Sequence, residues 1–173
     1  MSTQSTNVNA DRQLTTAEAV PIVFEDFYRT RRDHLARALA ITLRSDDLGN
    51  EAADEAMTRA FQRWRTVSGY GNPMGWCYRV GLNWALSRKK KMNREVPVAL
   101  PERGTEEASG LQPEIDAALS EIPMEQRAVL VLRFYLDWDI ERVAESLRIP
   151  AGTVKSRQRR GLDAVERRLE VRR

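Results

Sequence analysis

Cysteine and histidine each occur once in this chain of 173 residues, as Cys77 and His34. One cysteine cannot form a disulfide within the chain, and one cysteine with one histidine cannot complete a zinc site of the Cys/His type. The longest aliphatic run, 128–132, is far short of the roughly 20 apolar residues that span a bilayer. Residues 1–16 also lack the apolar segment of a secretory signal. These absences predict a soluble, cytoplasmic protein with no metal, no cofactor and no membrane insertion.

Charged residues are unevenly distributed along the chain. The net charge is +3 and the isoelectric point is about 9.3. Bases dominate residues 79–94 and 148–173, whereas acids dominate 46–55 and 102–125. Such separation indicates different surfaces for different partners, with phosphate groups favoured at the two basic segments. Ordinary solvated helix faces are the alternative interpretation.

Apolar residues recur every three or four positions almost throughout, which is typical of amphipathic helices. In the first half this spacing predicts helices over 22–44, 48–65 and 73–91. Glycines break the pattern before Asn72 and Pro73, which have the residue types of an N-cap and a first helical residue. In the third helix we expect the core face to carry Trp76, Val80 and Trp84.

Residues 94–112 interrupt the helical rhythm with prolines, glycines and acids, the composition of a flexible linker. Helical spacing resumes beyond it. The sequence therefore predicts an all-α protein made of two small helical domains joined by a flexible linker. The expected domains are 21–93 and 113–173, and we expect an N-terminal extension over 1–20 to be disordered.

Two predicted helices near the carboxy terminus, 139–148 and 153–169, are separated by a four-residue turn that contains Gly152. This pattern is typical of a helix-turn-helix, whose second helix presents its amino-terminal end to DNA. Thr153 is the expected N-cap of that helix. A helical hairpin with a solvated basic face is the alternative. The helix is expected to bury Val154, Leu162, Val165 and Leu169, and to point Lys155, Ser156, Arg159 and Arg160 outward, with Arg157 at the margin.

The segment Gly152-Thr153-Val154-Lys155-Ser156-Arg157 resembles the carboxy-terminal domain of bacterial sigma factors, and so does 122–133 ahead of it. Family members usually have a glycine in place of Asp137 and a glutamate-isoleucine pair in place of Arg142-Val143. The resemblance implies that this helix reads the minus-thirty-five promoter duplex in its major groove. The implied contacts are Thr153, Lys155, Ser156, Arg157, Arg159 and Arg160.

The segment 51–61 resembles the family helix that docks on the clamp helices of RNA polymerase. Asp54 stands where a glutamine is most common. The resemblance implies polymerase contacts by Glu51, Asp54, Glu55 and Arg59, and the acids among them would attract basic residues of the polymerase. A solvated helix face is the alternative.

The segment 72–88 resembles the family segment that opens the promoter and holds the single-stranded minus-ten element. A melted base needs a loop that closes around it, a planar group to stack on and an amide to read its edge. The expected loop is Ser68, Gly69, Tyr70, Gly71 and Asn72. Tyr78 and Arg79 are the expected stacking groups, Asn83 the amide, Ser87 a further readout position and Arg88 a backbone contact.

Both resemblances occur in the family's order, with no room for the extra domain of larger sigma factors. The chain is therefore identified as a member of the extracytoplasmic-function (group IV) sigma factors. This implies a non-enzymatic factor that binds core RNA polymerase, directs it to promoters and helps melt the minus-ten region. An anti-sigma factor is a candidate partner, because family members are often silenced by one.

Two rival functions remain at this point. One is an operator-binding regulator that uses only the helix-turn-helix and binds paired half-sites without polymerase. The other is a small helical enzyme, which is disfavoured because the sequence has no nucleophile–base pair, phosphate-binding loop or metal-ligand spacing. Cys77 is expected to be a packing residue and His34 a surface or interhelical residue.

Overall fold

The computed structural model describes residues 23–95 and 111–171, and every regular element in these ranges is helical. This confirms the predicted all-α class. None of the described helices is long and apolar enough to cross a membrane. The expected extension 1–20 and most of the expected linker, 96–110, lie outside the described residues. The elements are α1 (Phe24–Leu43), α2 (Asp46–Gln62), α3 (Trp64–Val67), α4 (Pro73–Glu95), α5 (Pro113–Ser120), α6 (Met124–Leu130), the π-helical segment η1 (Val131–Tyr135), α7 (Ile140–Leu147) and α8 (Ala151–Glu170).

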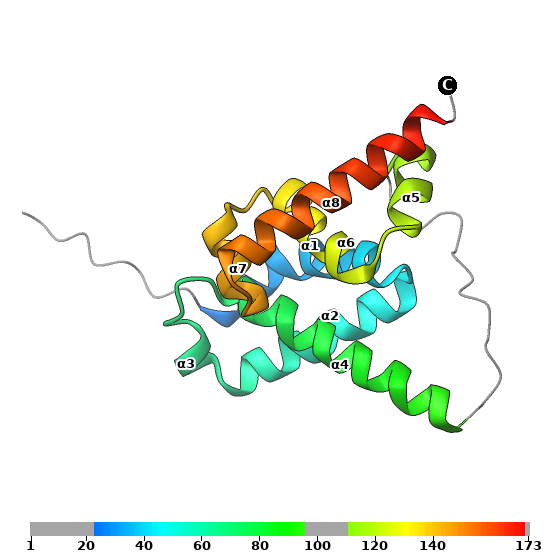
Figure 1. Ribbon diagram of the computed structural model, residues 1–173. Coiled ribbons are helices and arrows are strands. Elements are labelled where there is room, and N and C mark those ends of the chain that lie inside the picture. The colour runs from blue at the N-terminus through cyan, green and yellow to red at the C-terminus, as the bar shows by residue number, and fades with distance from the viewer. Residues whose placement is uncertain (1–22, 96–110, 172–173) are drawn as a thin grey trace, which may run out of the picture.

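Helices α1–α4 form a first helical group in which α2 packs along α1 and α4 packs against both (Figure 1). The Ser45 hydroxyl caps α2 by accepting a hydrogen bond from the Leu48 amide at 3.2 Å. At α4 the Asn72 side chain accepts from the Gly75 amide at 3.0 Å, and Pro73 is the first helical residue, as the sequence predicts. The carboxy-terminal end of α4 extends past the rest of this group (Figure 1).

Helices α5–α8 and η1 form a second helical group that contains the helix-turn-helix of α7 and α8. Asp139 caps α7 through a 2.7 Å bond from the Arg142 amide to its Oδ1. Asp137, which stands where family members usually have a glycine, has a φ of 53°. Aspartate is among the residues that tolerate this left-handed region best, so the glycine's backbone conformation can be kept without the glycine.

The turn between α7 and α8 differs from the prediction. Arg148, with a φ of 54°, ends α7 in the left-handed region, and α8 begins at Ala151 directly after Pro150. Gly152 and Thr153 therefore lie inside the first turn of α8, and the expected N-cap role of Thr153 is wrong. Proline fixes a φ that suits the entry to a helix, so the helix starts earlier than the residue types Gly-Thr suggest.

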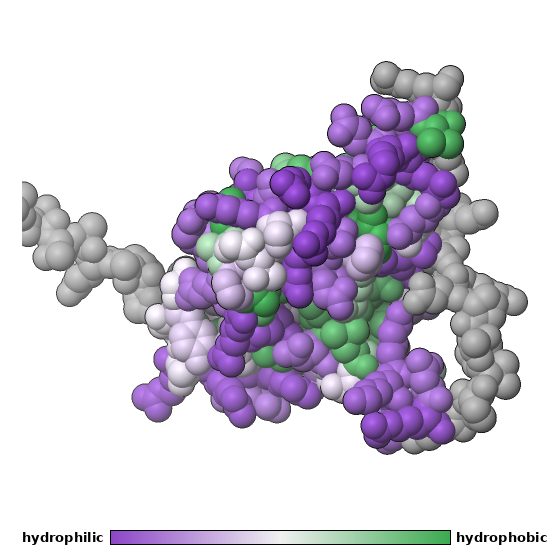
Figure 2. Space-filling view, viewed as in Figure 1, coloured by the Kyte–Doolittle hydropathy of each residue, from purple (hydrophilic) through white to green (hydrophobic). Residues whose placement is uncertain are grey.

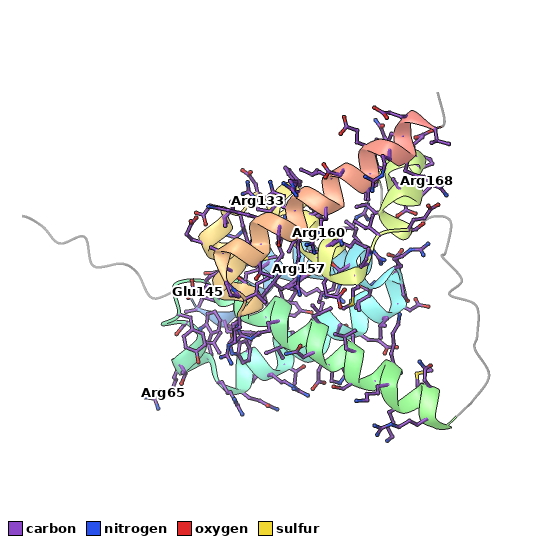
Figure 3. All side chains as sticks on the ribbon, in the orientation of Figure 1. Arg65, Arg133, Glu145, Arg157, Arg160 and Arg168 are labelled. Atoms are coloured by element: carbon purple, nitrogen blue, oxygen red, sulfur yellow. The ribbon has the colours of Figure 1, made fainter. Side chains whose placement is uncertain are left out.

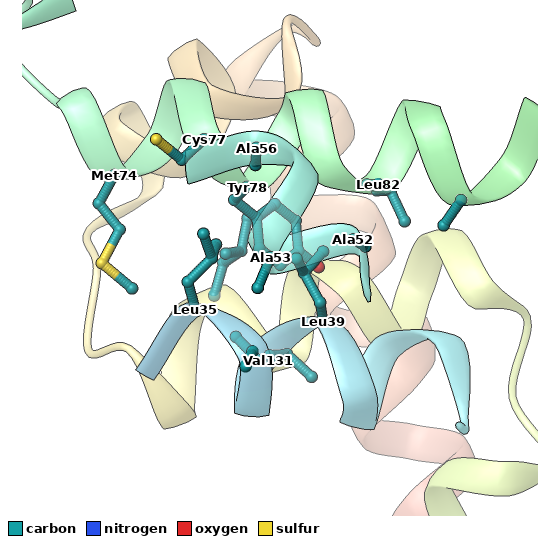
Figure 4. Packing of buried hydrophobic residues seen from close by; sticks show 14 of the residues in the cluster. Leu35, Leu39, Ala52, Ala53, Ala56, Met74, Cys77, Tyr78, Leu82 and Val131 are labelled. Carbon is teal, nitrogen blue, oxygen red and sulfur yellow. The ribbon is translucent and has the colours of Figure 1, made fainter. Parts of the chain in front are cut away.

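A single hydrophobic core connects the two groups. It includes Leu35, Leu39 and Tyr78 of the first group with Val131 and Val143 of the second. Figure 4 shows Val131 beside Leu35 and Leu39. Because α7 also packs on α4, and η1 and α6 on α1, the second group lies against one side of the first (Figure 1).

The core-facing side of α4 is rotated from the prediction, whereas that of α8 departs from it at Leu162. Trp76, Val80 and Trp84 are only partly buried, whereas Cys77, Tyr78, Leu82 and Ala85 are buried. In α8 Val154 is buried as predicted and Val165 and Leu169 are half-buried, but Leu162 is 41% exposed and Gly161 packs on Leu130 instead. In both helices a small residue allows close approach: a Cβ on Gly81 would lie 2.8 Å from the Ala52 carbonyl oxygen. Where a glycine lets two helices approach closely, the helix face that carries the glycine lies in the core. The larger apolar residues on the neighbouring faces then lie at the edge of the core.

Candidate polymerase and nucleic-acid interfaces

The outward side of the first half of α8 is basic and exposed. The four residues expected to face outward there, Lys155, Ser156, Arg159 and Arg160, are all exposed, and Thr153 and Arg157 are half-buried at its margin. We call these four exposed residues the basic face of α8. Figure 3 shows Arg157 and Arg160 along this helix, and in Figure 2 the exposed side of α8 is predominantly hydrophilic. Three cations on adjacent helical turns can reach phosphates and guanine edges in a major groove.

Arg133 of η1 holds α8 in place, a role that sequence reasoning missed. Its Nε donates to Gln158 Oε1 at 2.8 Å, and its Nη1 donates to the carbonyl oxygen of Trp138. The guanidinium thus connects α8 to the turn that precedes α7. No spacing rule predicts this bond, because its partners are brought together only by the fold of the second group.

The loop expected to close around a melted strand, residues 68–72, lies between α3 and α4, and we call it the strand-binding loop after that expectation. Ser68, Gly69, Tyr70 and Gly71 are exposed, and the ring of Tyr70 is 43% exposed. Asn72, the last residue of the loop, is buried. Arg79, which follows in the first half of α4, is half-buried. Burial, followed by the nearby positive charge of Arg148, lowers the pKa of Arg79. The loop therefore offers one exposed aromatic ring beside a partly desolvated guanidinium.

Three further predicted contacts lie on the exposed side of α4. Asn83, Ser87 and Arg88 are all exposed, and the spacing of Asn83 and Ser87 places them on one helix face. Beyond them, the basic end of α4 forms a hydrophilic surface in Figure 2. A polynucleotide that follows this face would meet an amide, a hydroxyl and then cations.

The expected stacking role of Tyr78 is wrong for this arrangement of the chain. Its side chain has an exposed fraction of 0%, and its hydroxyl lies 2.7 Å from the hydroxyl of Thr42. Burial raises the pKa of the phenol. Figure 4 shows the ring among Leu35, Leu39 and Ala53, in the core between α1, α2 and α4. Helical rhythm predicted Trp76 and Trp84 on the core face; both pack half-buried against the core, while Tyr78 lies fully inside it.

The acidic face of α2, which we define as Glu51, Asp54 and Glu55, is paired within the chain. Glu51 Oε2 lies 2.5 Å from Arg88 Nη1, Asp54 Oδ1 lies 2.8 Å from Arg32 Nη2, and Glu55 Oε1 lies 2.7 Å from Arg59 Nε. Glu51 and Asp54 are exposed and Glu55 is half-buried. The Glu51–Arg88 pair is exposed, and such pairs contribute roughly 0–1 kcal/mol, so a partner cation can replace Arg88 at little cost. Arg32 is only 21% exposed and also bonds Asn50 and Asp33, so it is held more firmly.

An exposed aromatic surface adjoins the acidic face of α2, and sequence reasoning did not single it out. Phe61 is 61% exposed and packs its ring 5.1 Å from that of Phe24. Together with Tyr28 and Thr58 these rings line a pocket of about 350 Å³ that Asp54 also borders. Apolar periodicity carries no signal for this exposure, because helical spacing does not distinguish an apolar core residue such as Ala60 from an apolar surface residue such as Phe61.

A second pocket, of about 440 Å³, lies between the two helical groups. Tyr70, Asn72, Trp76 and Arg79 line it from the first group, and Glu145, Ser146 and Arg148 line it from the second. Figure 3 shows Glu145 on α7 next to the loop that joins α3 and α4. Part of the strand-binding loop therefore faces the helix-turn-helix.

The described residues contain no group of three or more His, Cys, Asp or Glu side chains placed to hold a metal ion. Cys77 is buried, and burial raises the pKa of its thiol to about 12. His34 is exposed on α1. The burial of Cys77 agrees with its expected packing role, because a protonated, enclosed thiol is a poor nucleophile.

Comparison with known proteins finds sigma factors. Residues 112–165 match the family described as Sigma-70, region 4. The RNA polymerase sigma-E factor of Streptomyces coelicolor is 30% identical over 159 residues, which are 86% of this chain and 87% of that protein. The ECF RNA polymerase sigma factor SigX of Bacillus subtilis is 24% identical over 163 residues, covering 86% and 84% of the two chains.

A solved structure has a similar fold. It is the sigma factor RpoE in complex with the anti-sigma factor NepR from Bartonella quintana, with a TM-score of 0.67 and 23% sequence identity. The similarity covers 86% of this chain and 99% of that chain. The likeness to this structure is one of overall fold.

Proposed function

Because the chain belongs to the extracytoplasmic-function (group IV) family of RNA polymerase sigma factors, we propose that it binds core RNA polymerase and directs it to specific promoters. In this proposal it also helps to melt the minus-ten region, acts in the cytoplasm and catalyses no reaction itself. The observation that carries the proposal is the extent of the similarity to the sigma-E factor of Streptomyces coelicolor. It runs over 159 residues, 86% of this chain, and so includes residues of both helical groups.

Three surfaces would each bind a different partner. The acidic face of α2 with Arg59 would dock on polymerase, the strand-binding loop with the exposed side of α4 would hold the melted strand, and the basic face of α8 would read the minus-thirty-five duplex. The expected domains 21–93 and 113–173 are the units that carry these surfaces. Exposure supports the assignment, since each surface presents charged or polar groups to solvent.

Within the strand-binding surface, we assign the stacking role to Tyr70 and Arg79. Tyr70 is exposed, lies in the loop and lines the same pocket as Arg79. An aromatic ring and a guanidinium plane are the two groups on which a splayed-out base stacks. An anti-sigma factor remains a candidate partner, as RpoE of Bartonella quintana was crystallised with one.

Docking on polymerase is tested by co-elution of the full chain with purified core RNA polymerase. The test variant is the triple substitution Glu51→Ala, Asp54→Ala and Glu55→Ala. A matched control replaces three exposed acids of α8, Asp163, Glu166 and Glu170, by alanine, which changes the net charge equally. We expect co-elution of the parent chain and the control, and weaker co-elution of the test variant.

Loss of co-elution by the parent chain would contradict the proposal. In that case the helix-turn-helix alone would support an operator-binding regulator, and specific binding of duplex DNA by the free chain as a dimer would identify it. Equal co-elution of test and control variants would leave polymerase binding intact but remove the acidic face of α2 from the interface.

A further inference from the structure

A further pocket, of about 310 Å³, lies where α1, the start of α4 and the segment between η1 and α7 meet. Since a water molecule in the liquid occupies about 30 Å³, this volume corresponds to about ten waters. It lies at the lower end of the range for small-molecule sites, roughly 300–1,000 Å³. The residues of its lining that bear on binding come from both helical groups: Phe27, Arg31 and His34 of α1, and Tyr135, Trp138 and Arg142 of the second group.

The inner part of this pocket is apolar and aromatic. Phe27 and Met74 are each 6% exposed and Trp138 is 5% exposed, whereas Tyr135 is 38% exposed and borders the opening. Burial raises the pKa of the Tyr135 phenol, which therefore stays protonated at neutral pH and can donate a hydrogen bond. A flat ring suits such a lining, because ring–ring contacts add to the gain from burying apolar surface.

The charged side chains of the lining are cations. Arg31 and Arg142 are joined there by the imidazole of His34, and the described residues that line the pocket include no aspartate or glutamate. Arg31 and His34 are exposed, and their side chains form no hydrogen bond or ion pair with another described residue. Positive charge of this kind around an apolar space attracts an anion and disfavours a cation.

Arg142 is held in position beside the aromatic part of the pocket. Its Cζ lies 4.7 Å from the centre of the Trp138 ring, and its Nη2 donates to Asn72 Oδ1 at 3.1 Å. A guanidinium has five N–H groups, so the others can still donate to a ligand. Because the group is already stacked and oriented, less side-chain entropy is lost when it binds an anion.

The lining is poor in hydrogen-bond acceptors. Among its described side chains, the one carbonyl or carboxylate oxygen is Oδ1 of Asn72, which already accepts from the Gly75 amide at 3.0 Å and from Arg142. A sugar or an amine would bring donors that this oxygen cannot satisfy, whereas an ionised carboxylate brings acceptors only. A carboxylate also matches the planar geometry of a guanidinium for paired hydrogen bonds.

We propose that this pocket is a binding site for a small molecule that carries a planar aromatic ring and one carboxylate. The ring packs against Phe27 and Trp138, and the carboxylate accepts hydrogen bonds from Arg31 and Arg142. The site goes beyond the proposed function, since none of these four residues belongs to the three surfaces assigned there. Because both helical groups line the pocket, an occupied site stabilises the described arrangement of the two groups by mass action.

The probe is naphthoate, titrated into the free full chain in a calorimeter. We expect saturable binding of one naphthoate per chain, with a dissociation constant in the millimolar range or tighter, as is ordinary for a ligand of this size. Naphthalenemethanol keeps the rings and removes the charge, whereas cyclohexanecarboxylate keeps the charge and removes the aromatic rings. Each should bind about ten-fold more weakly than naphthoate, because each lacks one of the two kinds of contact.

Paired variants test where the probe binds. Arg31→Gln removes a lining cation, and its control is Arg29→Gln, which changes an exposed arginine of the same helix that pairs with Asp26 outside the pocket. Tyr135→Ala removes a lining ring of the second group, and its control is Phe134→Ala, which removes the adjacent exposed ring. We expect both lining variants to weaken naphthoate binding about five- to ten-fold and both controls to bind as the parent does.

Bound naphthoate should also raise the thermal unfolding midpoint of the parent, and raise that of Arg31→Gln less at the same concentration. Circular dichroism of each variant without ligand checks that its fold is kept. The absence of saturable binding by the parent, equal binding of naphthalenemethanol, or equal loss in the lining and control variants would overturn the proposal. Binding is measured on the free chain, so each of these outcomes is independent of co-elution with polymerase.

Discussion

Tyr70 and Tyr78 have opposite environments, and this difference gives a test of the strand-binding surface. Tyr70 is 43% exposed and Tyr78 is 0% exposed. We expect Tyr70→Ala to weaken fork-junction DNA binding about ten-fold, since stacking on an aromatic ring is worth about 1–3 kcal/mol per base. Its thermal unfolding midpoint should stay unchanged. The measurement is anisotropy of labelled DNA with the polymerase-bound chain.

The matched variant is Tyr78→Phe, which keeps the buried ring and removes the hydroxyl that contacts Thr42. We expect it to lose about 1 kcal/mol of the free energy of unfolding, measured by urea titration, and to bind DNA as the parent does. If Tyr70→Ala binds normally, the stacking group is another residue and the assignment of Tyr70 is wrong.

Cys77 gives the stability of the chain a dependence on alkaline pH. Burial raises the pKa of its thiol from 9.0 to about 12, so the folded chain keeps a proton that the unfolded chain releases above about pH 9. The stability that this proton contributes is present below that pH and is lost as the pH rises toward 12. We expect Cys77→Ala to show a smaller loss of unfolding free energy between pH 9 and 12 than the parent.

The control is the same comparison between pH 6 and 8. The thiol stays protonated there in both the folded and the unfolded chain, so the free energies of unfolding of the parent and Cys77→Ala should change with pH in the same way. The thiol should also resist iodoacetamide at pH 8 until urea unfolds the chain, because the thiolate is the reactive form. Rapid alkylation of the folded protein would contradict the burial of Cys77.

At the scale of the helices, two glycines have opposite surroundings and give a paired prediction. A Cβ on Gly152, in the first turn of α8, meets nothing within 4 Å, whereas one on Gly81 in α4 lies 2.8 Å from the Ala52 carbonyl oxygen. Gly152→Ala should therefore stabilise the chain by about 0.5–1 kcal/mol, since alanine is the better helix former. Gly81→Ala should destabilise it by about 1–3 kcal/mol, because a helix backbone must move.

Both variants are measured by thermal unfolding followed by circular dichroism. Each variant is the control for the other. The residue change is the same, from glycine to alanine within a helix, and the two sites differ mainly in how closely the neighbouring atoms pack. A stabilising Gly81→Ala would mean that α4 does not approach α2 as closely as described.

The helices show where sequence reasoning succeeded and where it stopped. Apolar spacing and caps located most of the described helices, because Asn72 and Asp139 are N-caps that act locally. It failed for α4, whose rotation depends on Gly81 meeting the distant helix α2. It also misplaced the start of α8, although the residues that set that start, Arg148 and Pro150, are adjacent in the sequence.

The candidate surfaces divide in the same way. The outward positions of α8 follow from helix geometry alone, and the four expected residues are exposed. The burial of Tyr78 and Asn72 does not follow from helix geometry alone. Tyr78 contacts Thr42 of α1, and Asn72 contacts Ser146 of α7, and both partners are far away in the sequence. The exposed ring of Phe61 was hidden from periodicity because helical spacing cannot tell a core residue from an apolar surface residue.

At the scale of the whole molecule, the shared core predicts cooperative unfolding. The apolar cluster that contains Leu35 and Tyr78 also contains Val131 and Val143, so neither helical group keeps its full core without the other. We expect one heat-absorption peak in scanning calorimetry, with a calorimetric enthalpy equal to the van't Hoff enthalpy. Two separated peaks in the parent chain would show that the groups fold independently.

Arg127 is the residue through which this coupling can be weakened. Arg127→Met removes the bond to the Thr42 carbonyl oxygen across the groups, and a buried acceptor left unpaired costs about 1–3 kcal/mol. Arg133→Met is the control, because Arg133 bonds Gln158 and the Trp138 carbonyl oxygen inside the second group. Both variants should melt earlier, but only Arg127→Met should broaden or split the calorimetric peak. A split in Arg133→Met alone would place the weakest link inside the helix-turn-helix group and not between the groups.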